Sequence, residues 1–356
     1  MKKFTKMWAI AACALFAGTA AVNAEDYTWK FVTAGDATTY AIRSDGSLWS
    51  WGWNEKGQGG NGVSERTATP TLADGNRVWK KAVGGKAYGF FLAEDGSLWA
   101  AGTHEGGVQG TNDGIDHKVL TRIGTDNDWA DMACSRFWGY SGFAIKTNGT
   151  LWAWGKNSAG QLGIGNTQAQ TAPVQVGADM DWKQVAAGCS SVLALKTDGS
   201  LWGWGFNMYS ELFGHEGKQL SPVRLGSETD WEQVVVIDFR AYAVKKDGTL
   251  WAWGDNANNL LGFNTPTEEE TTAEGNPVEV VTVPQITAPT HVTSIEGKVL
   301  TISGCENTLS VATGTDGVIE KVWMLGSNTD GALGDGKVWA TETRTFLSQK
   351  FRFILL

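Results

Sequence analysis

The residues that usually build metal sites and covalent cross-links are scarce in this chain. It has four cysteines and four histidines in 356 residues. Cys13 lies in an N-terminal leader, so three cysteines remain, and an odd number excludes a complete disulfide framework. The histidines fall at unrelated positions of the repeat described below, and no HExxH or GxSxG motif occurs. We therefore expect no catalytic residue, no metal and no cofactor, and a fold held together by packing.

Proline, basic residues and long apolar runs are also in short supply. Seven prolines beside 46 glycines exclude a collagen-like or low-complexity disordered chain. After the leader, no segment approaches the roughly 18 apolar residues that a membrane helix needs. The formal charge of −9 becomes about −12 once the leader with its three lysines is removed, and this balance is opposite to that of a phosphate-binding surface. We expect no membrane span in the mature chain and no nucleic-acid partner.

The first 24 residues have the pattern of a secretory signal peptide. A positively charged start with three lysines precedes a largely apolar stretch at 7–21, and Val22 and Ala24 stand at the positions that precede a cleavage point. We expect cleavage after Ala24 and export of residues 25–356 to the periplasm or the outside of the cell. A lipoprotein signal at Cys13 is the less favoured alternative, because few apolar residues precede that cysteine.

What the chain does have is a short sequence motif that occurs in six similar copies, which we call the repeated phrase. The phrase Asp-Gly-Ser-Leu-Trp-Ser-Trp-Gly begins at Asp45, and variants follow whose first tryptophan is at 99, 152, 202, 251 and 323. The spacing is close to 50 residues except for a last step of 72. A period of this length without helical patterning is typical of stacked four-stranded units. The sequence therefore predicts one all-β domain over residues 25–356.

The chemistry of a single copy fits a blade of four strands. In the fourth copy, short β runs at 182–188, 192–196 and 201–205 are divided by turn residues. Asp198-Gly199 predicts a tight hairpin of type I′, in which both residues take positive φ. Both tryptophans of Leu-Trp-x-Trp-Gly project to one face of their strand, so we expect them to pack against the neighbouring unit. The third copy has asparagine in place of the aspartate, which argues for a turn role and against an acid role.

A fourth strand is expected after each glycine loop, starting at a proline. The predicted strands begin at Pro173, Pro222 and Pro277, and proline suits the start of a strand, where no donor is required. Four strands in about 50 residues favour a β-propeller over a parallel β-helix, whose coils would be shorter. The tail after Gly336 has room for the fourth strand of copy six, expected around Thr345 to Leu347.

The Leu-Trp-x-Trp-Gly strand, the segment 182–188, Asn157 and the loop at 160–165 together resemble the regulator of chromosome condensation repeat. The resemblance spans nearly the whole mature chain and implies a propeller, usually of seven blades in that family. Six copies are present here, so a six-bladed ring and a truncated seven-bladed ring both stay open. Roles known in the family are nucleotide exchange on a nuclear GTPase, scaffolding and, in a secreted bacterial relative, inhibition of β-lactamase through one propeller face. We do not expect the first role, nucleotide exchange on a nuclear GTPase, for a chain that is exported and acidic.

Copies two and six depart from the repeat. Ala101 and Leu325 replace the second tryptophan of their copies, and an insertion at about 263–298 precedes copy six. The insertion is acidic, with glutamates at 268, 269, 270 and 274. We expect a solvated loop or an extra hairpin there, and a binding feature is the alternative.

Equivalent positions in different copies should lie on one ring around the propeller axis. Aligning the copies on the glycine about ten residues before each turn places six residues at one such point: Asp36, Lys86, Cys134, Cys189, Asp238 and Cys305. Three cysteines and two aspartates would suggest a metal, but cysteine also packs well at a strand end as a small apolar residue. Packing is the interpretation that we favour.

The loop after this ring varies most in residue type and predicts the binding face. Aromatic and arginine side chains are typical anchors of protein interfaces. The residues predicted to bind a partner are Tyr88, Arg136, Phe137, Trp138, Tyr140, Phe239 and Arg240. Phe137, Trp138 and Tyr140 could instead plug the tunnel mouth, and both interpretations stay open. The sequence thus predicts a non-enzymatic scaffold that binds another protein through one propeller face. Glycan binding and, less favoured, hydrolysis are the alternatives.

Overall fold

The computed structural model consists of β-strands and one short 3₁₀ helix, η1 (Glu105–Gly107), among the residues that it describes. These residues are 28–136, 139–257, 260–263, 269–271, 277–279, 285–305, 308–326 and 353–354. The predicted signal peptide therefore lies outside them. Within the described ranges, no helix is long and apolar enough to span a bilayer. The predicted all-β fold class is confirmed.

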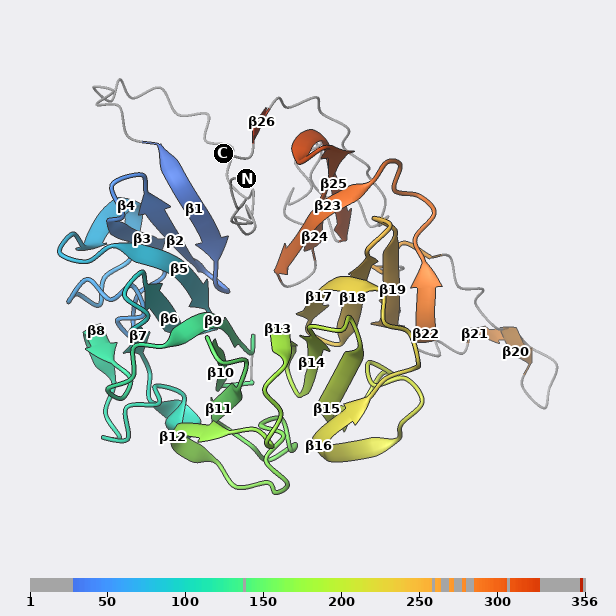
Figure 1. The fold of residues 1–356 in the computed structure, drawn as a ribbon, viewed down its shortest axis with the longest axis horizontal. Helices are drawn as coiled ribbons and strands as arrows, with labels where there is room; N and C mark the ends of the chain where they lie inside the picture. Colours follow the sequence, from blue (N-terminus) through green and yellow to red (C-terminus); the bar gives the residue numbers. More distant parts are fainter. Residues whose placement is uncertain are drawn as a thin grey trace.

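Six four-stranded antiparallel sheets follow one another along the chain and form the blades of a six-bladed β-propeller (Figure 1). Each blade supplies its first strand to one central tunnel, so the six-bladed alternative is confirmed. Blades one and two comprise β1 (Trp29–Ala34), β2 (Thr38–Arg43), β3 (Leu48–Gly52), β4 (Thr67–Asp74), β5 (Trp79–Gly84), β6 (Tyr88–Ala93), β7 (Leu98–Gly102) and β8 (His117–Arg122). Blades three and four comprise β9 (Trp129–Cys134), β10 (Ser141–Lys146), β11 (Leu151–Gly155), β12 (Gln170–Gln175), β13 (Trp182–Ala187), β14 (Ser191–Lys196), β15 (Leu201–Asn207) and β16 (Gly217–Arg224). Blades five and six comprise β17 (Trp231–Ile237), β18 (Arg240–Lys245), β19 (Leu250–Asp255), β22 (Gln285–His291), β23 (Val299–Cys305), β24 (Thr308–Thr315), β25 (Val318–Gly326) and β26 (Phe353–Ile354).

The aspartate of the repeated phrase caps its hairpin, but the turn differs from the predicted one. In blade four, Lys196 N–H donates to Ser200 O and Gly199 N–H donates to Lys196 O, which closes a three-residue loop. Gly199 has φ of +86° whereas Asp198 has no positive φ, so this is a type I turn followed by a left-handed glycine, and not type I′. The Asp198 carboxylate accepts hydrogen bonds from the Ser200 hydroxyl and N–H, at 2.6 and 2.8 Å. These bonds lower the pKa of Asp198 and identify it as a structural cap.

The same hydroxyl connects the turn to the tryptophans of the blade. Ser200 Oγ accepts a hydrogen bond from Trp202 Nε1 at 2.9 Å, and blades one, two, three and five repeat this chain of bonds. Lys196 Nζ lies 4.5 Å from the ring centroid of Trp202 and 5.0 Å from that of Trp182, a cation–π arrangement. Trp182 in turn contacts Trp204, with 6.0 Å between centroids. The repeated phrase therefore forms the frame of each blade, as its turn and packing chemistry predicts.

Neighbouring blades are joined through the glycine loop that follows each third strand. In three interfaces the second tryptophan of a blade donates to a carbonyl in the loop of the preceding blade, as Trp204 Nε1 does to Gln161 O at 2.9 Å. Ala101 and Leu325 cannot donate such a bond, and in their interfaces a tyrosine of the preceding blade donates instead. The pairs are Tyr40 with Gln58 O, at 3.0 Å, and Tyr242 with Leu260 O, at 3.2 Å.

The outer strand of blade five is not the one that the sequence predicts, which was expected to begin at Pro277. This strand is β22, in which Pro289 stands two residues before His291, the partner of Trp251. Pro277 belongs to the insertion, where β20 (Glu269–Thr271) and β21 (Pro277–Glu279) pair as a hairpin that projects from the ring (Figure 1). The assignment of Pro277 to the outer strand is wrong because Pro277-Val278 repeats the Pro-Val found in the outer strands of copies three and four. The expected extra hairpin is confirmed for these two strands.

Blade six also has features of its own. Asp316 and Gly317 have φ of +49° and +79°, and Thr315 pairs with Val318, so a type I′ turn is present here. Its outer strand is β26, which pairs with the first residues of β25. The fourth strand predicted around 345–347 lies outside the described residues.

Side chains at the third position of the inner strands link the blades around the tunnel. Gln184 exchanges two hydrogen bonds with the backbone of Val234, both at 3.0 Å. Gln233 Nε2 donates to Leu300 O at 2.7 Å, and its Oε1 accepts from Ile302 N–H at 3.4 Å. Lys81 forms an ion pair of 2.5 Å with Asp131 of the next blade. The complete set of residues at this position is Phe31, Lys81, Asp131, Gln184, Gln233 and Thr301. Blade one differs from its neighbours because the phenyl ring of Phe31 cannot form a bond of this kind.

Blade one is also less covered than its neighbours. Trp29 is 43 % exposed, whereas the tryptophans at the same position of blades two to five, Trp79, Trp129, Trp182 and Trp231, are at most 4 % exposed. Trp51 is half-buried, although its counterparts Trp154, Trp204 and Trp253 are fully buried. In blades two to five these rings pack under the preceding blade. One face of blade one therefore exposes more aromatic surface than any equivalent described face.

Candidate binding face

The strand order gives the propeller two different faces. The loops that join the first strand of each blade to the second, and the third to the fourth, emerge on one side, which we call the loop face. The hairpin turns and the linkers between blades lie on the opposite side, which we call the turn face. The turn face repeats the same capping and stacking contacts from blade to blade, so chemical differences between blades are concentrated on the loop face.

An asparagine organises the long loop between third and fourth strands in four blades. Asn157 Oδ1 accepts a hydrogen bond from Leu162 N–H at 2.9 Å, and its Nδ2 donates to the carbonyls of Asn166 and Gln168. Asn54, Asn207 and Asn256 bind their own loops through the same Oδ1 contact. Among the described loops, the loop of blade two is the exception, since His104 stands at this position.

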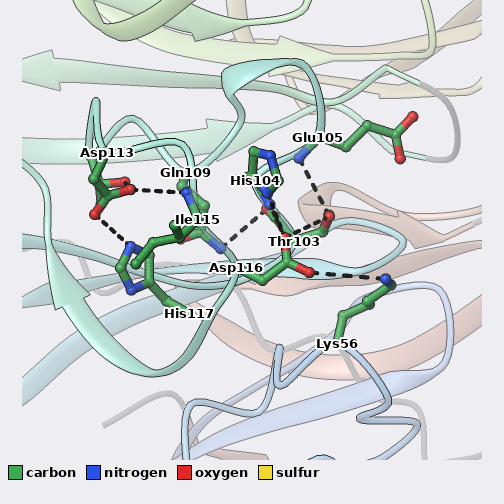
Figure 2. A network of polar contacts seen from close by, with 10 residues as sticks. Lys56, Thr103, His104, Glu105, Gln109, Asp113, Ile115, Asp116 and His117 are labelled. Carbon is green, nitrogen blue, oxygen red and sulfur yellow. Dashed lines mark hydrogen bonds and ion pairs between the residues drawn. The ribbon is translucent and has the colours of Figure 1, made fainter.

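Blade two holds its loop with two histidine–aspartate pairs (Figure 2). His104 Nδ1 lies 2.6 Å from Asp116 Oδ1, which also accepts from the His104 backbone N–H at 2.9 Å. His117 Nε2 lies 2.8 Å from Asp113 Oδ2, and Lys56 of blade one is 3.9 Å from Asp116. Burial would raise the pKa of both aspartates, but hydrogen bonds from the histidines and neighbouring groups outweigh it and hold each pKa below its usual range. We call the pairs His104–Asp116 and His117–Asp113 the histidine–aspartate clasp. The sequence did not indicate it, because the partners meet only once the loop is folded.

The loops between first and second strands meet at the tunnel mouth, and the predicted ring needs correction there. Cys134 pairs with Gly142 and Ala187 pairs with Val192, the second residue of each second strand, so Cys134 is equivalent to Ala187 and not to Cys189. Cys305 ends β23, one position before the ring. The described residues at the ring are Asp36, Lys86, Arg136, Cys189 and Asp238. The prediction is wrong in blade three because its loop at 135–140 is longer. The ring residue Arg136 therefore lies twelve positions before Asn148, whereas it lies nine positions before the turn aspartate in blades one, two, four and five. No group of three or more His, Cys, Asp or Glu side chains among the described residues is placed to hold a metal ion.

Arg136 spans part of the tunnel mouth. The tunnel cavity has a volume of about 170 Å³ and is lined by residues of all six inner strands and by Arg136. Arg136 follows the first strand of blade three, and its Nη1 donates to Ala34 O of blade one at 3.4 Å. This contact holds Arg136, a residue predicted to bind a partner, across the tunnel mouth. Phe137 and Trp138 lie outside the described residues, and their role stays a prediction.

Tyr88 and Tyr140, both predicted to bind a partner, are buried between blades two and three. Tyr88 is the first residue of β6, and its hydroxyl donates to Ser135 O at 2.5 Å. Tyr140 is 5 % exposed and has φ of +44°, and its ring centroid lies 5.9 Å from that of Tyr88. The structure brings the two rings together as supports of the loop at 135–140. Their contact with a partner stays a prediction.

The remaining predicted pair, Phe239 and Arg240, lies in blade five. Arg240 is 5 % exposed, with its guanidinium 3.7 Å from Asp255 and 4.0 Å from Asp238. Phe239 is half-buried, and its ring centroid is 5.0 Å from that of Tyr209 in the long loop of blade four. Phe239 is therefore the predicted residue with the best access to a partner among those described, and Arg240 supports the loop from below the surface.

Met208, Tyr209 and Phe239 form an aromatic and methionine patch on the loop face, which we call the loop-face patch. Met208 is 47 % exposed and Tyr209 is half-buried. The sequence prediction missed Met208 and Tyr209. A signal was present, because Met-Tyr-Ser at 208–210 replaces Ser-Ala-Gly at 158–160, and Ser210 keeps the left-handed backbone of the glycine with φ of +66°.

The same loop carries a buried carboxylate. Glu211 is fully buried and accepts hydrogen bonds from Tyr209 N–H at 2.8 Å and from the Ser191 hydroxyl at 3.3 Å. Burial, reinforced by the nearby Asp255 carboxylate, raises the pKa of Glu211 to about 7. Blades one and three have glutamine at this position. The interface of blades four and five thus contains a group that titrates near neutral pH.

Two family models match the repeated phrase and its strands. A model described as the regulator of chromosome condensation (RCC1) repeat matches residues 45–92 and 148–195, and a second model of that repeat matches residues 29–58. The matched segments are regulator of chromosome condensation repeats. The family resemblance of the sequence is thereby confirmed.

This regulator of chromosome condensation repeat protein is similar to longer proteins over part of their length. It is 30 % identical to the ultraviolet-B receptor UVR8 of Arabidopsis thaliana over 163 residues, which are 45 % of this chain and 37 % of that protein. It is 27 % identical to human protein RCC2 over 150 residues, which are 41 % of this chain and 19 % of that protein. The matches thus span less than two fifths of either relative.

Two solved structures share the fold. Human WBSCR16 superposes with a TM-score of 0.72 at 16 % identity, over 92 % of this chain and 83 % of that chain. Prp20p of Saccharomyces cerevisiae superposes with a TM-score of 0.66 at 19 % identity, over 80 % of this chain and 68 % of that chain. At such identities the likeness shows the fold alone.

Proposed function

We propose that this protein is an exported, non-enzymatic scaffold that binds another protein through its loop face. The observation that carries the proposal is the loop-face patch of Met208, Tyr209 and Phe239, drawn from two blades. Aromatic and methionine side chains are enriched in protein interfaces, where they supply a large contact area at a small entropic cost. The repeated tryptophans of blades two to five are engaged in folding contacts, so this patch is the strongest candidate anchor on the loop face.

Protein binding by a related propeller supports the proposal. The structure of yeast Prp20p was described together with its binding to Gsp1p and histones, and a further structure has Kap60 bound to yeast RCC1 (Prp20). These interactions belong to the yeast protein. They support protein binding as the use of this kind of propeller, and the different loop residues of each chain would select its partner.

Export is proposed from residues 1–24 alone. Their charged start, apolar stretch and cleavage pattern are those of a signal peptide. Expression of the full chain with a C-terminal tag, followed by N-terminal sequencing of the exported fraction, tests this point. We expect Glu25 as the first residue, and an intact Met1 on a protein retained in the cytoplasm would contradict it.

Capture of partners from the native envelope fraction, with residues 25–356 as bait, tests the binding role. The double variant Tyr209→Ala/Phe239→Ala should reduce capture of a specific protein at least about tenfold, since paired aromatic anchors contribute a large part of interface energy. The matched control is Met180→Ser, which removes an apolar side chain that is 61 % exposed on the turn face. Equal capture by both variants, with folding intact, would show that the loop-face patch is not the binding surface. Specific retention of glycans in place of protein would favour the glycan-binding alternative.

A further inference from the structure

The glycine loop of blade four is attached to the next blade differently from its counterparts. In the loops of blades one, two and three, the N–H of Gly62, Asn112 or Gly165 donates to a carbonyl in the outer strand of the next blade, at 2.8–3.0 Å. The residue at this position in blade four is His215, whose N–H donates to Leu212 O within the same loop. This N–H therefore does not fix the blade-four loop to blade five.

Residues 208–210 lie between two anchored points of this loop. On one side, the Asn207 side chain binds the backbone further along the loop through its Oδ1 and Nδ2 atoms. On the other side, Glu211 O accepts a hydrogen bond from Trp253 Nε1 of blade five at 2.8 Å. Between these points Ser210 has φ of +66°, at a position where blades one and three have glycine. A residue with a Cβ atom is strained in this left-handed region, so the segment carries strain between anchored ends.

The buried carboxylate of Glu211 holds this segment in place. Its Oε2 accepts from Tyr209 N–H at 2.8 Å, and the ring of Tyr209 contacts that of Phe239 in the loop-face patch. Its Oε1 accepts from the Ser191 hydroxyl of β14 at 3.3 Å. The position of a patch residue therefore depends directly on one buried side chain that can change its charge.

The charged groups that face Glu211 compensate its negative charge poorly. Burial, reinforced by the Asp255 carboxylate of β19, raises the pKa of Glu211 to about 7. The guanidinium of this interface is that of Arg240 in β18, and it lies 3.7 Å from Asp255 and 4.0 Å from Asp238 of the preceding loop. Two other carboxylates thus share this cation, and an ionised Glu211 gains from contact with water.

We propose that ionisation of Glu211 opens segment 208–210 and separates Tyr209 from Phe239, so that the loop-face patch is assembled at acidic pH and dispersed at alkaline pH. The neutral carboxyl group can stay buried, whereas the carboxylate reaches water once the segment moves. The closed loop binds the proton more tightly than the open loop, so the ratio of open to closed loop rises between pH 4.5 and about 7 and stays higher above it. The opening is a property of the loop itself, and its effect on partner binding rests on the proposed function.

Amide hydrogen exchange can compare two equivalent N–H groups that have different acceptors. Tyr209 N–H donates to the Glu211 carboxylate, and Ala159 N–H donates to the neutral Gln161 amide of blade three, both at 2.8 Å. Between pH 5 and pH 8, after correction for the intrinsic exchange rate, the protection of Tyr209 should fall about 70-fold, the factor implied by a pKa that changes from about 7 to 4.5 on opening. The protection of Ala159 should change less than about threefold. Glu211→Gln should make Tyr209 behave like Ala159, and it leaves His215 of the same loop in place.

A second readout follows the patch itself. Residues 25–356 contain four methionines, at 132, 180, 208 and 324, so ¹³C-methyl labelling gives a spectrum of four methionine signals. The Met208 signal should shift as pH rises through neutrality in the parent and stay fixed in Glu211→Gln. Met180, which is 61 % exposed on the turn face, is the control and should not shift in either protein.

Three results would overturn the proposal. An equal fall in protection at Tyr209 and Ala159 would report unfolding of the whole chain in place of local opening. The other two are a pH dependence that persists in Glu211→Gln and a Met208 signal that does not move. If Glu211→Gln does not fold, the comparison of Tyr209 with Ala159 in the parent decides the question. Neither readout uses a partner, so this test and the capture experiment can fail independently.

Discussion

At the scale of single residues, a tyrosine of the preceding blade takes over as hydrogen-bond donor in the two described interfaces where the second tryptophan is missing. Blades two, three and four have Phe90, Phe143 and Leu193 where Tyr40 and Tyr242 stand in blades one and five. In those three the next blade supplies a tryptophan N–H to the loop carbonyl, so no hydroxyl is needed. The two tyrosines occur where the next blade has alanine or leucine. In the five interfaces whose loop is described, the loop carbonyl therefore has a donor.

Removal of one such hydroxyl should be costly. Tyr40→Phe leaves the Gln58 carbonyl without its donor in a buried interface, and an unsatisfied buried acceptor costs about 1–3 kcal/mol. Urea unfolding of the variant measures this loss of unfolding free energy. Tyr209→Phe is the control, since this half-buried tyrosine should change stability by less than about 0.5 kcal/mol. A Tyr40→Phe variant as stable as the parent would show that another group satisfies the carbonyl.

The buried Glu211 should make stability depend on pH near neutrality. Its pKa is raised from 4.5 to about 7 in the folded protein. The folded state therefore binds more protons in this interval, so stability falls as pH rises from 4.5 to about 7 and stays lower above it. Glu211→Gln should remove this loss and stabilise the protein at pH 8 by up to about 3 kcal/mol, with much less effect at pH 5. Gln161 indicates that the amide fits, because its Oε1 accepts from Ala159 N–H as Glu211 does from Tyr209. Urea unfolding at both pH values measures the difference, and an equal effect at both would contradict the assignment.

At the scale of elements, the sequence predicts the strands and caps of a blade well, because period-two patterning and Asp-Gly signals are local. It predicts the turn type poorly, since Asp198-Gly199 is compatible with both a two-residue and a three-residue loop, and the register of the flanking strands decides between them. The prediction of the outer strand of blade five is wrong for a related reason. Pro277 and Pro289 both follow the glycine loop, and only pairing with β19 distinguishes them.

The histidine–aspartate clasp of blade two should stabilise its loop without contributing much to the whole fold. Asp116→Ala removes the acceptor for both the ring and the N–H of His104. We expect faster amide exchange over residues 103–117 and a change in global unfolding free energy below about 1 kcal/mol, because the pair is exposed. Glu55→Ala is the control, since it breaks an exposed ion pair with Arg66 in blade one. Gln109 Nε2 also donates to Thr103 O, at 3.1 Å. Unchanged amide exchange in the blade-two loop would show that this bond and the backbone bonds hold the loop without the clasp.

At the scale of the whole molecule, six sequence copies give six blades, but the binding face depends on contacts that no single copy contains. Tyr209 and Phe239 meet because blades four and five are neighbours on the ring. The position of Tyr88 varies between copies, as a surface position would. Tyr88 is nevertheless buried, and its hydroxyl donates to Ser135 O of the next blade. Sequence variation between copies therefore marks both partner-facing and interface residues, and only the ring geometry separates the two.

The ring geometry also makes equivalent tryptophans unequal. Trp79 is fully buried between blades one and two and donates to Asp74 at 3.1 Å, whereas Trp29, at the same position of blade one, is 43 % exposed. Trp79→Ala should cost about 3–5 kcal/mol, the range for a large buried side chain. Trp29→Ala should cost less than about half of that, because much of its ring is in water in the folded state as well. Urea unfolding of the two variants compares one chemical change at one repeat position. Equal costs would show that the face of blade one is covered in solution as completely as its counterparts.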